Sequence, residues 1–101
     1  MTDEHTARDI IVLTLLRHEI TMSEMIGPGS RQETCRARWT AMYLIREVCQ
    51  YSNGRIGRLF GGRDHSTVMH GIQRIGELAI EDGEIRGHLR SIRAALKKIE
   101  T

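Results

Sequence analysis

The chain has 101 residues, enough for one domain with one modest core and too few for an ATPase or kinase domain plus anything else. Hydrophobic residues make up 40% and charged residues 28%, which excludes wholesale disorder. No apolar run approaches the ~20 residues that span a bilayer, and the first residues are acidic, unlike the basic start of a signal peptide. We expect a single cytoplasmic domain over residues 1–101, with no membrane segment.

Positive charge is concentrated in the middle of the chain. Residues 31–74 contain eight arginines and three acidic residues, whereas residues 1–30 contain two arginines and five acidic residues. Arginine has a planar fork that suits bidentate contacts to phosphates and guanine edges. The middle segment therefore fits a nucleic acid, although a solvated basic surface without a ligand has the same composition.

The first part of the chain predicts one long and one short helix. Thr6 and Asp9 resemble a capping box ahead of an apolar stretch, which predicts a deeply buried helix from about 7 to 20. Ser23 is the expected cap of a short helical turn. The Gly-Pro-Gly sequence at 27–29 then breaks the chain.

A second capping-box pattern, at Ser30 and Glu33, predicts a long helix that ends at about Gln50. At ~100° per residue this helix has two different faces. The apolar face carries Ala37, Ala41, Leu44, Ile45 and Val48. The opposite face carries Trp39, Tyr43, Arg46 and Gln50.

The next two predicted helices are separated by a glycine turn. Ser52 is the expected cap of a short helix through Leu59, and the glycines at 61–62 provide the backbone freedom for a turn. Asp64 is the expected cap of the following helix. That helix has a buried stripe of Val68, Ile72, Ile75 and Ala79. Its opposite face carries Ser66, His70 and Gln73, flanked by Thr67 and Arg74.

This order of short helix, turn and polar-faced helix is the outline of a helix-turn-helix, within a core at residues 30–79. A helix fits the major groove, where Asp64 can accept from cytosine, His65 can donate to a base acceptor and the Thr67 methyl can touch thymine. The same residue types are ordinary helix caps, so the pattern alone leaves both roles open.

After Gly83, a last helix carries apolar residues at alternating spacings of four and three. These residues are Ile85, Leu89, Ile92, Leu96 and Ile99. Two heptads are too few for a convincing coiled coil, so we expect the seam to pack on the domain itself. A homodimer or a protein partner along the seam stays open. The whole chain is predicted to be all-α and compact, with about five to six helices.

A longer signature lies at the predicted turn. Residues 56–70 are I-G-R-L-F-G-G-R-D-H-S-T-V-M-H and are followed by Arg74-Ile75. This run resembles the signature of the C-terminal DNA-binding domain (domain IV) of the bacterial replication initiator DnaA, and Arg38 with residues 41–44 matches the long helix of that domain. The resemblance covers essentially the whole chain. It implies a Trp-repressor-like helix-turn-helix fold that binds double-stranded DNA sequence-specifically.

The resemblance also implies which residues contact DNA. In that family the aspartate, the histidine and the first hydroxyl residue of the signature read bases in the major groove. The corresponding positions here, with their neighbours on the helix, are Asp64, His65, Ser66, Thr67 and His70. The expected contacts to the DNA backbone or the minor groove are Arg31, Gln32, Arg38, Arg46, Asn53, Gly54, Arg55, Arg63, Gln73 and Arg74.

One position of the family pattern is altered ahead of the long helix. The family places a minor-groove arginine six residues before the position of Arg38, where this chain has Gln32. Arg31 is one residue away. Either the loop shifts to deliver Arg31, or the minor-groove contact is weakened.

Four further positions depart from the family. Ser66 replaces the usual threonine, and Asn53-Gly54 replaces a common Leu-Pro pair. Gly71 replaces a small alanine or serine, and Trp39 replaces a polar residue. These departures permit a target that is related to the usual initiator box but differs from it.

The family's full-length initiator carries an ATPase domain, whereas these 101 residues contain no G-x-x-x-x-G-K-[ST] loop. We therefore expect a nucleoid-associated regulator of replication initiation or transcription that occupies DNA without opening it. No enzymatic activity, bound nucleotide or cofactor is expected.

Two other classes of function compete with DNA binding. A metal site or hydrolase is disfavoured because His65 and His70 lie about 140° apart around a helix, and neither Cys35 nor Cys49 has a C-x-x-C partner. A protein-interaction module is the alternative function, with Trp39 and Tyr43 forming an exposed aromatic pair that docks a partner. Coverage of this pair by the terminal helices is the competing expectation.

Overall fold

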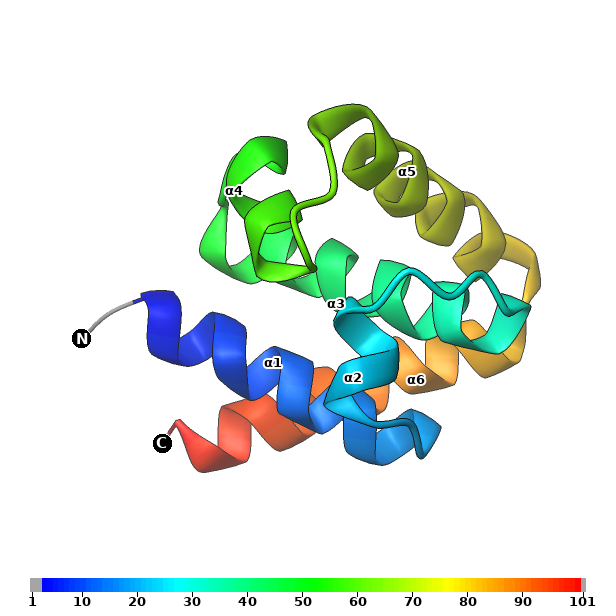
Figure 1. Cartoon of the computed structure of the whole chain (residues 1–101). Helices are drawn as coiled ribbons and strands as arrows, with labels where there is room; N and C mark the ends of the chain where they lie inside the picture. Colours follow the sequence, from blue (N-terminus) through cyan, green and yellow to red (C-terminus); the bar gives the residue numbers. More distant parts are fainter. Residues whose placement is uncertain (1–2, 101) are drawn as a thin grey trace.

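Helix α3 (Gln32–Cys49) is the centre of the fold, because every other helix of the described residues packs against it. The computed structural model describes residues 3–100, and Figure 1 shows how they are arranged. The other helices are α1 (Asp3–His18), α2 (Met22–Ile26), α4 (Asn53–Leu59), α5 (His65–Glu81) and α6 (Gly83–Ile99). No strand occurs among these residues. The all-α prediction is therefore confirmed.

One hydrophobic core holds the six helices together. The α3 residues Ala37, Ala41, Leu44 and Ile45 are at most 1% exposed. They belong to a cluster that includes Ile10 of α1, Met25 of α2, Ile56 of α4, Val68 and Ile75 of α5, and Leu89 of α6. Burial of this apolar area is the main stabilisation of the fold.

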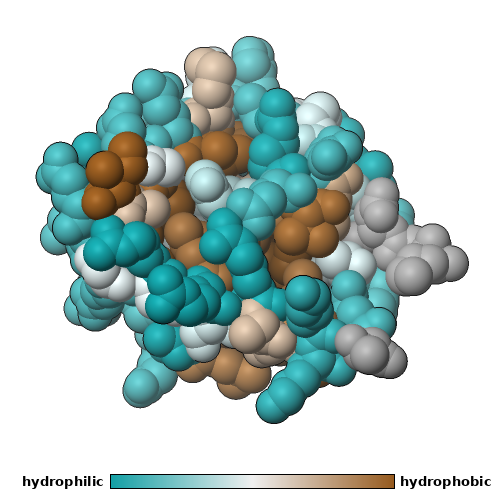
Figure 2. Space-filling view, turned by 180° about the vertical axis from the view of Figure 1, so that it is seen from behind, coloured by the Kyte–Doolittle hydropathy of each residue, from teal (hydrophilic) through white to brown (hydrophobic). Residues whose placement is uncertain are grey.

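Helix α1 is buried on one side only, contrary to the prediction of deep burial. Ile10 and Thr14 are fully buried, but Leu16 is 70% exposed. Helices α3 and α6 cover one side of α1, and the other side is left to solvent. Hydrophobic residues are also visible on the face opposite to that of Figure 1, where hydrophilic side chains divide them (Figure 2).

Three predicted helix caps in the first part of the chain are wrong. Thr6 lies inside α1, which begins at Asp3. Thr21 rather than Ser23 caps α2, since its hydroxyl accepts from the Glu24 amide at 3.1 Å and the Glu24 carboxylate accepts from the Thr21 amide at 2.8 Å. Helix α3 begins after Arg31, not Ser30, and has no side-chain cap. The three-residue spacing of a capping box also occurs within helices, so the pattern does not by itself locate a helix start.

The caps of the later helices match the sequence more closely. The Ser52 hydroxyl accepts from the Arg55 amide at 3.1 Å and starts α4. Gly61 and Gly62 both have φ of +78°, so the turn uses the conformations that glycine permits. Gly83 does not break the chain but is the first residue of α6, which Asp82 caps.

The seam of α6 packs on the domain, as expected, through Ile85, Leu89, Ile92 and Leu96. Its last member, Ile99, is 57% exposed. A search of the helices that the structure describes finds none long and apolar enough to cross a membrane.

Candidate nucleic-acid interface

The first turn of α5 is exposed and anchored by Asp64. Oδ1 of Asp64 accepts from the Thr67 amide at 2.9 Å, and this bond is the N-cap of the helix. Hydrogen bonds from Thr67 lower the pKa of the Asp64 carboxyl below its ordinary value, so the carboxylate is charged at neutral pH. His65, Ser66 and Thr67 are all exposed. The three side chains are therefore free to meet a ligand.

The exposed face of α5 continues past the first turn. His70 and Gln73 lie on the solvent side, opposite the buried Val68 and Ile75. Met69 lies on this side too and is 53% exposed, and the sequence prediction missed it. Its position three residues after Ser66 places it near the polar face, which is the signal that could have found it. An exposed apolar side chain here can contact a thymine methyl.

Arg38 does not lie in this interface, so the expectation of a DNA contact is wrong. Its side chain is 3% exposed. The guanidinium donates to the carbonyl oxygens of Met25 at 2.7 Å, Glu24 at 2.9 Å and Gly27 at 3.2 Å. The side chain thus satisfies carbonyl groups at the end of α2, where no further helical turn exists to donate N–H groups to them.

Arg63 has a related structural role. Its guanidinium donates to the Gly27 carbonyl at 2.6 Å and also to the carbonyls of Phe60 and Ile26. Burial lowers the pKa of Arg63, and nearby Arg38 lowers it further. We call Arg38, Arg63 and the carbonyl groups to which they donate the arginine cluster; the Gly27 carbonyl accepts from both. The cluster fixes the turn before α5 against the end of α2, and Nη1 and Nη2 of Arg63 both donate to protein carbonyls.

A glycine that the sequence prediction did not single out shapes the same turn. The Gly57 carbonyl accepts from the amides of Gly62 at 3.1 Å and Arg63 at 3.0 Å. A Cβ atom at position 57 would lie 1.9 Å from the Arg63 carbonyl oxygen, so no other residue fits. This close approach sets the angle between α4 and α5.

Other residues predicted to contact the DNA backbone are exposed or partly exposed, and they make short-range contacts. Arg46 of α3 donates to the Asn53 side chain at the start of α4, next to Gly54. The Arg55 guanidinium lies 3.7 Å from the centre of the Tyr51 ring. Such contacts hold the cationic groups in place without burying them.

Farther along α5, Gln73 and Arg74 both face Glu77. The side-chain amide of Gln73 and the guanidinium of Arg74 each lie 3.4 Å from a Glu77 carboxylate oxygen. Arg74 therefore has a neighbouring negative charge, which reduces its attraction for a phosphate relative to a free arginine.

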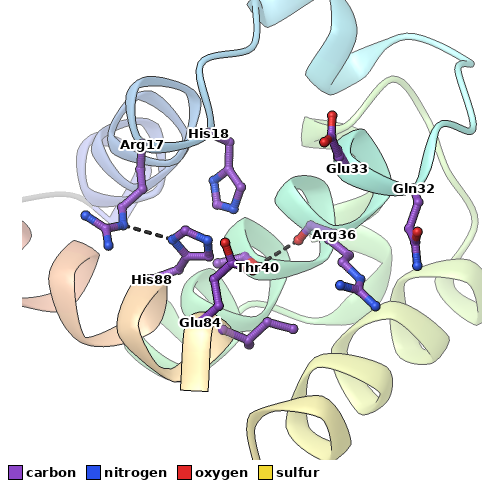
Figure 3. A pocket seen from close by; sticks show the side chains of 9 residues that line it. Arg17, His18, Gln32, Glu33, Arg36, Thr40, Glu84 and His88 are labelled. Carbon is purple, nitrogen blue, oxygen red and sulfur yellow. Dashed lines mark hydrogen bonds between the residues drawn. The ribbon is translucent and has the colours of Figure 1, made fainter. Parts of the chain in front are cut away.

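The start of α3 faces in a different direction. Arg31 is exposed, with Nη2 3.7 Å from a Glu33 carboxylate oxygen. Gln32 and Arg36 line a pocket of about 430 Å³ whose other side is formed by α1 and α6 (Figure 3). Gln32 is therefore not brought together with the first turn of α5.

Two histidines lie in the same pocket. The rings of His18 and His88 have centroids 4.5 Å apart, and Nε of Arg17 donates to Nδ1 of His88 at 2.9 Å (Figure 3). Burial lowers the pKa of both histidines below the ordinary value, with a further lowering by Arg17. Within the residues described, no group of three or more His, Cys, Asp or Glu side chains is placed to hold a metal ion.

The proposed aromatic docking pair is partly covered, Trp39 by α5 and Tyr43 by α5 together with Arg93 of the last helix, α6. Trp39 and Tyr43 are half-buried and pack against the core. The Trp39 ring lies against Gly71, and the Tyr43 ring lies near Gly76. Much of the surface of this pair is therefore used inside the domain, and the interaction module based on an exposed pair is not supported.

The arrangement of α4, the glycine turn and an exposed, capped α5 defines a helix-turn-helix domain of the DNA-binding class. A family model described as the bacterial DnaA protein helix-turn-helix matches residues 7–75. The chain belongs to this family.

Relatives agree with this assignment. A chromosomal replication initiator protein DnaA of Roseobacter denitrificans is 48% identical over 81 residues, covering 80% of this chain and 18% of the relative. The protein of the same name from Thermus thermophilus is 49% identical over 72 residues, or 71% of this chain and 16% of the relative. The protein of the same name from Thermomicrobium roseum is 35% identical over 94 residues, which cover 92% of this chain and 20% of the relative. The chain thus spans about a fifth of the length of these curated relatives.

Proposed function

We propose that the chain binds double-stranded DNA sequence-specifically, at sites related to the initiator box of its family, and regulates replication initiation or transcription. The observation that carries the proposal is the exposed first turn of α5, where Asp64, His65 and Ser66 stand free of other protein segments. In this placement the side chains reach base edges in the major groove. The relatives' name, chromosomal replication initiator protein, supports a role in replication.

The phosphate contacts are assigned to groups beside this turn. Arg46 and Asn53 form one pair at the start of α4, and Arg55 is exposed two residues after Asn53. These groups position the protein on the duplex, whereas α5 reads the sequence. The action proposed for these residues is the occupancy of DNA sites.

Selection of bound duplexes from a random pool tests the proposal, followed by titration of the selected and a scrambled duplex. The protein should prefer the selected duplex, with a log-log salt slope of about −0.9 per phosphate contact. Substitution of His65 or Asp64 should abolish the preference, whereas Arg46→Ala should weaken all duplexes alike. Arg90→Ala removes an exposed arginine of α6 and is the charge-matched control. Equal binding of both duplexes by the unchanged protein would contradict the proposal.

A further inference from the structure

Two unusual residues of this chain form a single packing unit. A Cβ atom at position 71 would lie 2.3 Å from Cδ1 and 2.8 Å from Nε1 of Trp39. Real Cβ atoms do not approach that closely, so the indole can occupy its place only because residue 71 is glycine. The tryptophan on α3 and the glycine on α5 are therefore one feature rather than two separate departures from the family pattern.

The same indole contacts His70. The two ring centroids lie 5.8 Å apart with an interplanar angle of 85°, which is an edge-to-face arrangement. Aromatic pairs prefer this geometry because the positive edge of one ring meets the negative face of the other. Trp39 is itself half-buried against the core, so it gives the His70 ring a fixed surface on the side of α3.

His70 is exposed to solvent although its ring is held. It lies four residues after Ser66, which places it one turn farther along the same face of α5. A neutral imidazole offers one N–H donor and one acceptor, and a base edge in the major groove offers matching groups. A side chain that is already fixed in the free protein loses less conformational freedom when it binds.

We propose that His70 is a specificity-determining residue of the DNA interface and that Trp39 is the positioning residue that holds its imidazole. The inference rests on the proposed DNA binding and deepens it. The first turn of α5 reads one part of the site, and His70 reads the base pairs next to it. A protein of this family without the Trp39 and Gly71 pair lacks the same support for that ring.

The competing account is that Trp39 and Gly71 only fill space between α3 and α5. The two accounts differ in the variant Trp39→Gln/Gly71→Ala, which exchanges the pair for residue types usual in the family. This variant fills the space with smaller groups but removes the indole from His70. A purely packing role predicts unchanged base preferences, and a positioning role predicts a loss confined to the base pairs that His70 reads.

The experiment selects duplexes from a random pool with the full chain and then measures the affinity for every single-base change in the selected duplex. The four proteins are the unchanged chain, His70→Ala, Trp39→Gln/Gly71→Ala, and His5→Ala as the control for an exposed histidine on α1. Circular dichroism and urea unfolding of each protein show that it is folded at the assay temperature.

In the result we expect, His70→Ala loses discrimination by about 5- to 150-fold at one or two adjacent base pairs and keeps it elsewhere. The paired variant loses about two- to tenfold at the same base pairs, because the ring must now be ordered on binding. When His70→Ala is added to the paired variant, the loss of base discrimination should equal that of His70→Ala alone.

Two results would overturn the inference while leaving the proposed function in place. In the first result, His70→Ala selects the same duplex as the unchanged chain and discriminates equally well at every base pair. In the second, the paired variant weakens binding to all duplexes equally. If the unchanged chain enriches no duplex at all, both the inference and the proposed function fail.

Discussion

The first turn of α5 and the arginine cluster lie next to each other in the sequence but serve opposite purposes. Asp64, His65 and Ser66 are exposed, and their main contact with the rest of the protein is the helix cap that Asp64 forms with the Thr67 amide. Arg63 is adjacent to them, yet its guanidinium turns inward to the end of α2, where the buried Arg38 also donates. The charged residues of one motif thus divide into those that can meet a ligand and those that build the turn.

The hydrogen-bond partners of an arginine, rather than its residue type, decide what it does in this domain. A guanidinium whose donors are all directed at protein carbonyls has no free donors for a phosphate. Substitutions in the arginine cluster should therefore lower stability, whereas substitutions in the first turn of α5 should lower binding preference.

The largest effect is expected for Arg38→Met. The change removes the Arg38 donor from the carbonyls of Glu24 and Met25 and leaves the Gly27 carbonyl with Arg63 alone, so the free energy of unfolding should fall by about 3–5 kcal/mol. Urea unfolding followed by circular dichroism measures the change. Arg8→Met, at an exposed site of α1, should change stability by less than about 0.5 kcal/mol. Equal stability of the two variants would place Arg38 on the surface.

The next effect is expected between Trp39 and Gly71. Trp39→Gln should cost about 2–4 kcal/mol because it empties space between α3 and α5, and Gly71→Ala should cost about 1–3 kcal/mol because its methyl overlaps the indole. The double variant should be more stable than the sum of these losses predicts. Thermal or urea unfolding of the unchanged protein, the two single variants and the double variant measures this difference as a double-mutant cycle. Strict additivity would show that the two residues do not touch.

A smaller effect separates the two roles of Asp64. Asp64→Ala removes the cap of α5 and should cost about 1 kcal/mol of stability along with the base preference. Asp64→Ser keeps a capping oxygen, so its stability should stay near that of the unchanged protein while the preference is still lost. Unfolding and DNA titration of both variants measure the two quantities. Retention of preference by Asp64→Ser would show that the carboxylate only caps the helix.

The smallest effect is a pH dependence from the pocket between α1 and α6. The pKa values of His18 and His88 are lowered in the folded state, so the unfolded chain binds more protons as the pH falls below about 6.5. The free energy of unfolding should therefore be at its plateau above that pH and decrease below it. His88→Gln should flatten the slope between pH 5 and about 7 when urea unfolding is repeated across this range. An unchanged slope would assign the pH dependence to other groups.

The sequence predicts the helix-turn-helix core well because its local signals agree with its packing. The caps at Ser52 and Asp64, the glycine turn and the buried stripe around Val68 and Ile75 all point to the same arrangement. The caps of the first three helices could not be located from local sequence signals. A capping-box spacing at Thr6 is indistinguishable from two residues one turn apart inside α1.

The sequence predicts which residues of the candidate site are exposed on α5, but it does not predict which residues are covered by distant segments. Exposure of His65 and Ser66 follows from their position at the start of an amphipathic helix. The burial of Arg38 could not be read from the sequence, because it depends on the carbonyls of α2, which lie more than ten residues earlier in the chain. Coverage of Trp39 by α5 likewise depends on the long-range contact with Gly71.

The position of α5 against DNA is tested most directly by titrating the ¹⁵N-labelled chain with its selected duplex and following each backbone amide by NMR. We expect the largest changes in chemical shift at residues 64–70 and at the start of α4, and no changes on the outer face of α6. Changes concentrated on α6 or α1, with the amides at the start of α5 unaffected, would contradict this expectation.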